Sequence, residues 1–370
     1  MIMAKMSKLA ISVLLLMGLA FSGCSDNVNS VSDGSGRDMR AAEAQNLDGI
    51  LLTKMLSRID LGHFGDIHSV LIARNDVLVL EEYFNGYDRN QSQLIYSVTK
   101  SVTSALVGIA LQQGFVQSTD QKLLEFFPQY ANVDNLDTRK QAITLENLLT
   151  MTAGLQWDEW SIPYNQPGND ATRLYNSGDW MAFMLNLPMT AAPGERFIYS
   201  SGVTMLLSGI LQESVGTTAA NFAASELFVS LGISNPPWDA GPGGITNTGW
   251  GLHLRPIDMA NFGSLYLHND RIGTKQVVPE QWVALSTQKH IATNNGYDYG
   301  YQWWRFRDGS EVANLLRTND IFFAWGYGGQ FIFVVPHLNM VVVTTAGNFT
   351  DARPGFSLLR DHILPAVKDR

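Results

Sequence analysis

The sequence predicts an α+β fold in which an antiparallel sheet, flanked by N- and C-terminal helices, carries an inserted and mostly helical region. Strand-like segments rich in Val, Ile and Leu lie near residue 70 and again at residues 330–345, whereas the segment between them has helical patterns. Each strand group alone is too small to bury one face of a sheet, so we expect the two groups to form one sheet. With 45% hydrophobic and 16% charged residues, the 370-residue chain has enough apolar residues for a large core.

Charge and cysteine content exclude several classes of function. The net charge is −9 and no run of basic residues occurs, so we expect no nucleic-acid partner. A single cysteine, Cys24, excludes an internal disulfide framework, a thiolate zinc site and an iron–sulfur cluster. We expect no metal and no cofactor.

The first 23 residues are typical of an export signal. Lys5 and Lys8 precede an apolar run that is too short to span a bilayer comfortably. The run ends in Phe21-Ser22-Gly23-Cys24, which resembles a bacterial lipoprotein box and predicts lipidation at Cys24; simple secretion with cleavage near Gly23 is the alternative. Residues 24–45 are predicted to be a flexible tether, so the protein would lie in the cell envelope or periplasm and contact the membrane only through this anchor.

Three elements are predicted next. Residues 47–59 have nearly helical apolar spacing, residues 68–84 form two strand-like runs around Asn75-Asp76, and residues 97–113 form an apolar helix that ends at Gly114. The apolar positions of the first helix are Ile50, Leu51, Met55, Leu56 and Ile59.

The rest of the chain predicts a helical middle and a strand-rich end. Candidate helices lie at residues 145–151, 179–187, 200–215, 219–231 and 256–267, and no strand pair stands out among them. Strands are predicted at residues 330–336 and 340–345, followed by a last helix at 356–367. We therefore expect an α/β sandwich from residues 46–115 and 286–370, and a mostly helical domain from residues 116–285.

Ser97 and Lys100 open the apolar helix three positions apart, so their side chains share one helix face. A serine hydroxyl becomes nucleophilic when a base removes its proton, and a lysine in an apolar pocket loses its charge near neutral pH. The pair predicts a nucleophile with its base; Ser97 as a helix cap and Lys100 as a solvated residue is the alternative. A second copy, Ser286 and Lys289, lies near the end of a shorter helix and is less favoured.

Two further segments are candidates for the same site. Tyr199 and Ser201 precede an apolar helix, where the phenol would relay a proton and Ser201 would bond the substrate or the lysine. Tyr199 as a packed aromatic and the rival segment Tyr175-Asn176-Ser177 are alternatives.

The segment 325–330, Trp-Gly-Tyr-Gly-Gly-Gln, precedes a strand. Its glycines allow close approach of substrate, and the backbone amides of Gln330 and Ser97 would hold an oxyanion. A plain glycine-rich turn explains this segment nearly as well.

Together these segments resemble the β-lactamase-related serine hydrolases, which include class C β-lactamases, D-alanyl-D-alanine carboxypeptidases, lactamase-fold esterases and 6-aminohexanoate-oligomer hydrolases. Ser97-x-x-Lys100 is similar to the nucleophile motif, Tyr199-x-Ser201 to the Tyr-x-Asn or Tyr-x-Ser motif, and Tyr327-Gly328-Gly329 lies in the place of the Lys-Thr-Gly or His-x-Gly motif. Similarity extends over about residues 46 to 365, through segments 145–159, 254–267 and 299–304. The resemblance implies a β-lactamase/penicillin-binding-protein-like fold and acyl-enzyme chemistry.

Two departures bear on the substrate that the resemblance implies. Tyr327 replaces the cationic Lys that helps hold a substrate carboxylate, and no lysine or arginine occurs between Thr318 and Thr350. Ser201 replaces the Asn whose amide contacts the acylamino group of lactams. We therefore expect a small-molecule ester or linear amide as substrate. The segment 157–170 is placed like a cleft loop, in which Asp158, Tyr164 or Asp170 would contact substrate, although ordinary loop polarity explains these residues equally well.

Other classes of function are less favoured. No G-x-S-x-G elbow occurs, which disfavours the α/β-hydrolase type of Ser-His-Asp enzyme. His63, Asp66 and His68 lack a third nearby imidazole, which disfavours a metal site. The main alternative is a weakly catalytic or non-catalytic, penicillin-recognising or scaffold lipoprotein of the cell envelope, since the fold alone does not exclude it.

Overall fold

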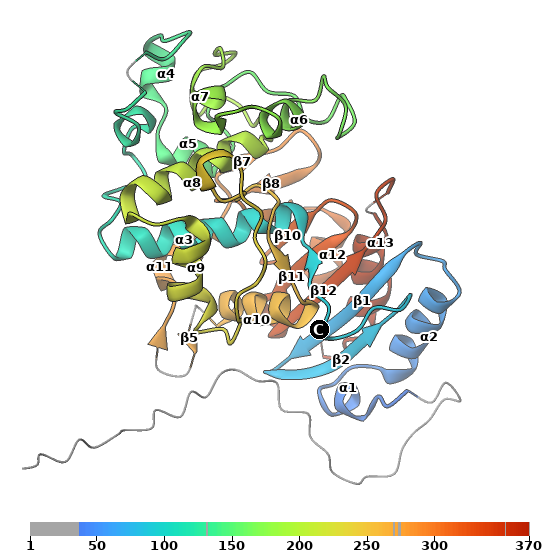
Figure 1. The fold of residues 1–370 in the computed structure, drawn as a ribbon. Helices are drawn as coiled ribbons and strands as arrows, with labels where there is room; N and C mark the ends of the chain where they lie inside the picture. Colours follow the sequence, from blue (N-terminus) through green and yellow to red (C-terminus); the bar gives the residue numbers. More distant parts are fainter. Residues whose placement is uncertain (1–36, 131, 269–270, 273–274, 352, 370) are drawn as a thin grey trace, which may run out of the picture.

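The computed structural model describes residues 37–369, apart from 131, 269–270, 273–274 and 352 (Figure 1). The expected export signal, Cys24 and most of the expected tether lie outside the described residues. The tether was expected to reach residue 45, whereas the structure has a short helix, α1 (Arg40–Ala44), in which Ala42 is fully buried. Folded structure therefore begins before residue 46.

The central element is an eight-stranded antiparallel sheet built from both ends of the chain, in the order β2-β1-β12-β11-β10-β9-β8-β7 (Figure 1). The N-terminal strand β1 pairs directly with the C-terminal strand β12, which confirms the predicted fold class. The strands are β1 (Ile67–Arg74), β2 (Val77–Tyr83), β7 (Ile291–Ala292), β8 (Tyr297–Tyr299), β9 (Trp304–Phe306), β10 (Phe322–Gly326), β11 (Gln330–Val335) and β12 (Met340–Ala346).

The predicted hairpin at residues 68–84 is confirmed as β1 and β2. Asn75 and Asp76 form its turn and have φ angles of 49° and 63°, so both residues are in the left-handed region. Asparagine and aspartate tolerate that region better than other non-glycine residues, which is why this pair marks a two-residue turn.

Side chains alternate along each strand, so both faces of the sheet carry side chains. Helices cover both of these faces. On one face, α10 (Pro256–Leu267) packs so closely that a Cβ at Gly263 would lie 2.7 Å from both Ile332 and Val341. On the other face, Phe356 of α13 (Arg353–Ser357) packs on Phe331, with ring centroids 4.7 Å apart. The bounds of the two domains remain a prediction. Helix α10 lies within the expected helical domain but packs against the sheet.

Helix α2 (Gly49–Asp60) matches the predicted N-terminal helix and begins after Asp48, whose side chain accepts a hydrogen bond from the Leu51 amide at 3.0 Å. Its buried face differs from the one expected. Ile50 and Leu51 are 55% and 37% exposed, and the buried stripe is Leu52, Met55, Leu56 and Ile59. This stripe follows the i, i+3, i+4, i+7 spacing more closely, so Leu52 takes the place of the two exposed residues.

The helical region between the two parts of the sheet centres on two buried helices, α3 (Thr99–Gln112) and α8 (Ser201–Val215), which pack on each other (Figure 1). The structure also has two short strand pairs in this part of the sequence that were not expected, because strands of two residues show no alternation: β3 (Gln93–Leu94) with β4 (His253–Leu254), and β5 (Arg271–Ile272) with β6 (Lys275–Gln276). The other helices are α4 (Thr138–Ala142), α5 (Leu145–Leu149), α6 (Asp170–Tyr175), α7 (Trp180–Leu185), α9 (Ala219–Ala223), α11 (Glu280–Thr287), α12 (Glu311–Leu316) and α14 (Leu364–Ala366). Among the helices in the described residues, none is long and apolar enough to cross a membrane.

Candidate active site

Ser97 lies on a tight turn that joins the sheet side of the molecule to α3. The turn is a 3-10 segment, Tyr96–Val98, and Tyr96 has a φ angle of 47°. A bulky residue in the left-handed region costs about 1–3 kcal/mol and persists only where the surroundings hold it. Here β10 and β11 contact the turn, and a Cβ at Gly326 would lie 2.3 Å from the Ile95 carbonyl oxygen. These two strands thus fix the backbone that carries Ser97.

Lys100 follows one helical turn later and is buried, with 2% of its surface exposed. Its Nζ donates hydrogen bonds to Ser97 Oγ at 3.0 Å, to Ser201 Oγ at 3.0 Å and to the Gly249 carbonyl oxygen at 2.7 Å. Burial lowers the pKa of Lys100 to about 8, although the charge of Glu159 opposes that shift. The amine therefore titrates near neutral pH, in hydrogen-bond contact with a serine hydroxyl.

Tyr199 lies over the same lysine, with its ring centroid 5.0 Å from Lys100 Nζ. Burial and the charge of Glu159 raise the pKa of Tyr199 well above its usual range, and a hydrogen bond with Ser97 lowers it only in part. The phenol is therefore a proton donor at neutral pH. Its ring is stacked on Trp160 and on Trp304, with centroids 5.1 Å and 5.7 Å away.

Ser201 connects this group to a buried acid. Its hydroxyl accepts from Lys100 and donates to Glu159 Oε1 at 2.9 Å, and its backbone amide donates to Glu159 Oε2 at 2.7 Å. Glu159 itself is only 2% exposed. Ser97, Lys100, Tyr199 and Ser201, which we predicted from two separate segments, thus lie in one connected cluster.

The glycine-rich segment forms the hairpin turn between β10 and β11. Gly328 and Gly329 have φ angles of 82° and 100°, which explains why glycine is needed there. The side chain of Gln330 is buried and bonded to Ala346, to whose carbonyl oxygen its Nε2 donates at 2.5 Å. The side chain therefore holds the hairpin, which leaves only the backbone of Gln330 for the predicted oxyanion role.

Tyr327 projects from this hairpin and is 41% exposed. Its ring lies 5.7 Å from Tyr96, 5.2 Å from Tyr164 and 5.2 Å from Phe349 between centroids. Phe349 is also exposed, at 46%. The surroundings of Ser97 on this side are therefore aromatic.

The three loop residues proposed as substrate contacts have different surroundings. Tyr164 lies in the cluster, because its hydroxyl donates to Glu159 Oε1 at 3.1 Å. Asp158 accepts hydrogen bonds from the amides of Trp160 and Ser161, both at 3.0 Å. Asp170 is buried, accepts from the Asp158 amide at 2.8 Å and pairs with Arg173 at 2.7 Å. Through these bonds the two aspartates hold their own loop in place.

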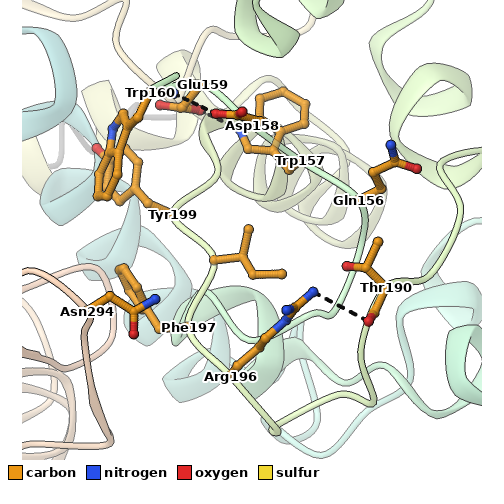
Figure 2. A pocket seen from close by; sticks show the side chains of 11 residues that line it. Gln156, Trp157, Asp158, Glu159, Trp160, Thr190, Arg196, Phe197, Tyr199 and Asn294 are labelled. Atoms are coloured by element: carbon orange, nitrogen blue, oxygen red, sulfur yellow. Dashed lines mark hydrogen bonds between the residues drawn. The ribbon is translucent and has the colours of Figure 1, made fainter. Parts of the chain in front are cut away.

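A cavity of about 350 Å³ adjoins the cluster on the Tyr199 side. Figure 2 shows Trp160 lying over Tyr199 at one end of this cavity, with Arg196 and Thr190 toward the other. Glu159 and Trp157 also line it. The stacked rings of Trp160 and Tyr199 therefore contribute an apolar wall beside the reactive groups.

Sequence reasoning missed three members of the cluster: Glu159, the Gly249 carbonyl and Trp160. Glu159 carried a weak signal, because an acid flanked by Trp157 and Trp160 is unusual for a solvated loop. A backbone carbonyl such as that of Gly249 carries no signal in a sequence.

The alternatives from the sequence have other contacts. Tyr175 packs on Trp180 and Trp250, at 6.1 Å and 6.2 Å between ring centroids. His68 bonds Gln93 and Asp66, at 2.7 Å and 3.1 Å, and stacks on Tyr87. Within the described residues, no group of three or more His, Cys, Asp or Glu side chains is arranged to hold a metal ion.

Comparison with known proteins places this geometry in a family. The beta-lactamase family profile matches residues 68–361. A 6-aminohexanoate-dimer hydrolase of Paenarthrobacter ureafaciens is 22% identical over 297 residues, which cover 74% of this chain and 70% of that protein.

Solved structures share the fold at low identity. EstCE1, described as a hydrolase with promiscuous acyltransferase activity, has a TM-score of 0.67 at 17% identity and covers 89% of this chain and 99% of its own. A beta-lactamase/D-alanine carboxypeptidase from Yersinia pestis, complexed with citrate, has a TM-score of 0.67 at 16% identity, covering 86% and 99%. With the profile match over most of its length, the chain belongs to the beta-lactamase family of serine hydrolases.

Proposed function

We propose that this protein hydrolyses an ester or a linear amide through an acyl-enzyme on Ser97. The observation that carries this proposal is the 3.0 Å contact between Lys100 Nζ and Ser97 Oγ, made by a lysine that is 2% exposed. A base is most effective when its pKa lies near the working pH, and burial lowers the pKa of Lys100 to about 8.

The proposed reaction begins when neutral Lys100 takes the proton of Ser97 as the oxygen attacks the substrate carbonyl. The backbone amides of Ser97 and Gln330 stabilise the oxyanion. Tyr199, a protonated phenol hydrogen-bonded to Ser97, donates a proton to the leaving alcohol or amine and recovers one from Lys100. Water then attacks the acyl-enzyme by the same steps, with water as the nucleophile and Ser97 as the leaving group. This step releases the acid and restores Ser97.

The proposed substrate is uncharged near the reacting carbonyl. Tyr327 stands where lactam-binding relatives carry a cation, and the exposed rings around Ser97 belong to Tyr327, Phe349 and Trp160. Aromatic surface favours apolar acyl or leaving groups over a carboxylate. The names of two similar proteins, a 6-aminohexanoate-dimer hydrolase and the hydrolase EstCE1, support a substrate range that extends beyond lactams.

Two assays test this function. A fluorophosphonate probe should label the wild-type protein at Ser97, and a panel of p-nitrophenyl esters, short amide oligomers and nitrocefin should show turnover of an ester or amide well above that of nitrocefin. Faster turnover of nitrocefin would overturn the substrate assignment. No labelling at Ser97 would overturn the catalytic assignment and favour the penicillin-recognising or scaffold protein.

We also propose that the protein is exported and anchored by a lipid at Cys24. The proposal rests on the sequence of residues 1–24, which has the pattern of a lipoprotein signal. Mass spectrometry of the native N-terminus distinguishes a diacylglyceryl-modified Cys24 from an unmodified secreted chain.

A further inference from the structure

The buried acid Glu159 is surrounded by hydrogen-bond donors. Its Oε2 accepts from Trp157 Nε1 and from the Ser201 amide, each at 2.7 Å. Its Oε1 accepts from Ser201 Oγ at 2.9 Å and from Tyr164 OH at 3.1 Å. These four hydrogen bonds fix the position and orientation of the carboxylate.

The loop that carries Glu159 is itself fixed. Asn169 is fully buried, and its side-chain amide donates to the backbone carbonyls of Glu159 at 3.0 Å and of Ile162 at 2.7 Å. Asp170 accepts from the Asp158 amide at 2.8 Å. The carboxylate is therefore held at one place relative to α8, where Ser201 begins the helix.

A continuous line of polar contacts joins Glu159 to the nucleophile. The Ser201 hydroxyl has one proton, which it donates to Glu159, so its lone pairs face Lys100 Nζ at 3.0 Å. Lys100 in turn contacts Ser97 Oγ at 3.0 Å. Without Glu159, the Ser201 hydroxyl would be free to rotate and to donate its proton elsewhere.

We propose that Glu159 is a positioning residue for the reaction: through Ser201 it holds Lys100 toward Ser97, and its charge stabilises the ammonium that forms when Lys100 takes the Ser97 proton. This inference rests on the proposed function of Ser97 and Lys100. The proton moves from Ser97 Oγ to Lys100 Nζ, and Glu159 neither gains nor loses one.

The charges around Lys100 support this role. Lys100 faces Ser97, Ser201, the Gly249 carbonyl and the ring of Tyr199, and among the described residues Glu159 is the acid whose charge raises the pKa of Lys100. Burial raises the pKa of Tyr164, Tyr199 and Tyr299, and the same charge raises it further. Glu159 therefore opposes the effect of burial on the Lys100 amine and adds to it on these phenols.

The test is the pH dependence of ester hydrolysis by Glu159→Gln in the full chain. Removing the negative charge should lower kcat by roughly 10- to 100-fold, because a hydrogen bond to a charged group is lost, and should move the rising limb of the pH profile to lower pH. Asp258→Asn is the matched control, since it removes another buried acid, one that pairs with Arg255 and has no part in holding Glu159. We expect this control to leave the midpoint of the limb at the wild-type pH, whatever its effect on folding.

Ser201→Ala supplies a second, independent measurement. It breaks the line between Glu159 and Lys100 but leaves the other three donors to the carboxylate in place, so it keeps the test available if Glu159→Gln does not fold. We expect a lower kcat and a midpoint at lower pH here too, because the ammonium loses an acceptor. If Glu159 acts through Ser201, the double variant should lose little more activity than the more affected single variant.

The outcomes separate the two proposals. An unshifted midpoint in Glu159→Gln or in Ser201→Ala, with an active wild type, would show that Glu159 has only a structural role and would overturn this inference alone. A wild type without Ser97-dependent turnover would overturn the proposed function and this inference together.

Discussion

The chain contains two Ser-x-x-Lys segments, and only the first has the geometry of a reactive pair. Ser97 lies before the first turn of α3, so Lys100 follows it one helical turn later and the two side chains meet at 3.0 Å. Ser286 lies near the end of α11, which stops at Thr287, and Gln288 is extended with a ψ angle of 164°. Lys289 therefore leaves the helix, and its Nζ pairs with Asp298 at 3.2 Å.

The two segments also differ in burial, in opposite senses. Lys100 is 2% exposed and Ser97 is partly exposed, which suits the base and the nucleophile that we propose. Ser286 is fully buried and donates to the Val283 carbonyl of its own helix at 3.2 Å, whereas the Lys289 side chain is 56% exposed. The spacing of the two residue types thus has chemical meaning only where a helix continues through both and a pocket removes water from the lysine.

The largest expected difference between the two segments concerns the serines. Ser97→Ala should abolish fluorophosphonate labelling and lower ester turnover on the order of 10⁴-fold or more, because removing the nucleophile removes the covalent pathway. Ser286→Ala should keep both activities near wild type, since its hydroxyl bonds only its own helix. Labelling measured by mass spectrometry and initial rates with p-nitrophenyl acetate check both variants. Wild-type turnover in Ser97→Ala would contradict the assignment of Ser97 as the nucleophile.

The Ser97 pair and the fold were accessible from sequence because both depend on local patterns. The helix opening at residue 97, the Asn75-Asp76 turn and the apolar runs of β11 and β12 are each encoded within about ten residues. Local spacing was less reliable where two apolar positions compete for one face. Ile50 and Leu51 were expected on the apolar face of α2, whereas the structure buries Leu52 and leaves both of them exposed.

The remainder of the site depends on contacts between distant parts of the chain. Glu159 is 42 residues from Ser201, and the Gly249 carbonyl is 149 residues from Lys100. Nothing in the sequence of this loop indicated that the Asp170 carboxylate would accept from the Asp158 amide, and the Asp158 carboxylate from the amides that follow it, while Glu159 turned inward. A buried carboxylate is recognised only when its donors are brought to it by the fold.

The lysines give the next largest expected difference. Lys100→Ala should lower kcat by roughly 10²- to 10⁴-fold, the usual contribution of a general base, whereas Lys289→Ala should change it little because that ammonium is exposed. Initial rates on the same ester check this difference. Equal losses in the two variants would mean that burial and contact with Ser97 do not distinguish the lysines.

A smaller effect is expected from pH in the wild type. Burial lowers the pKa of Lys100 to about 8, and only the neutral amine accepts a proton, so about one tenth of the molecules are competent at pH 7. The rate should therefore rise about tenfold per pH unit below pH 8 and level off above it. Rates in kcat/KM from pH 6 to 9, with Ser97→Ala subtracted as the blank for spontaneous hydrolysis, measure this limb. A flat profile would mean that the base is not a group with a pKa near 8.

The smallest expected effect tests the substrate side of the comparison, where the family cation is replaced by Tyr327. Tyr327→Lys should raise the affinity for carboxylate-bearing lactams by roughly two- to fivefold, the range of a solvent-exposed ion pair, because Tyr327 is 41% exposed and water screens the new charge. Inhibition of ester hydrolysis by a penicillin measures that affinity.

The new lysine also removes a ring that packs on Tyr96, Tyr164 and Phe349, so charge and packing must be separated. Tyr327→Gln is the matched control, because it removes the same ring and adds a long polar side chain without a charge. A gain in Tyr327→Lys but not in Tyr327→Gln assigns the effect to the cation. If both variants bind the penicillin equally, the ring rather than the missing charge limits lactam binding, and the proposed preference for neutral esters and amides must then arise from the aromatic surroundings of Ser97.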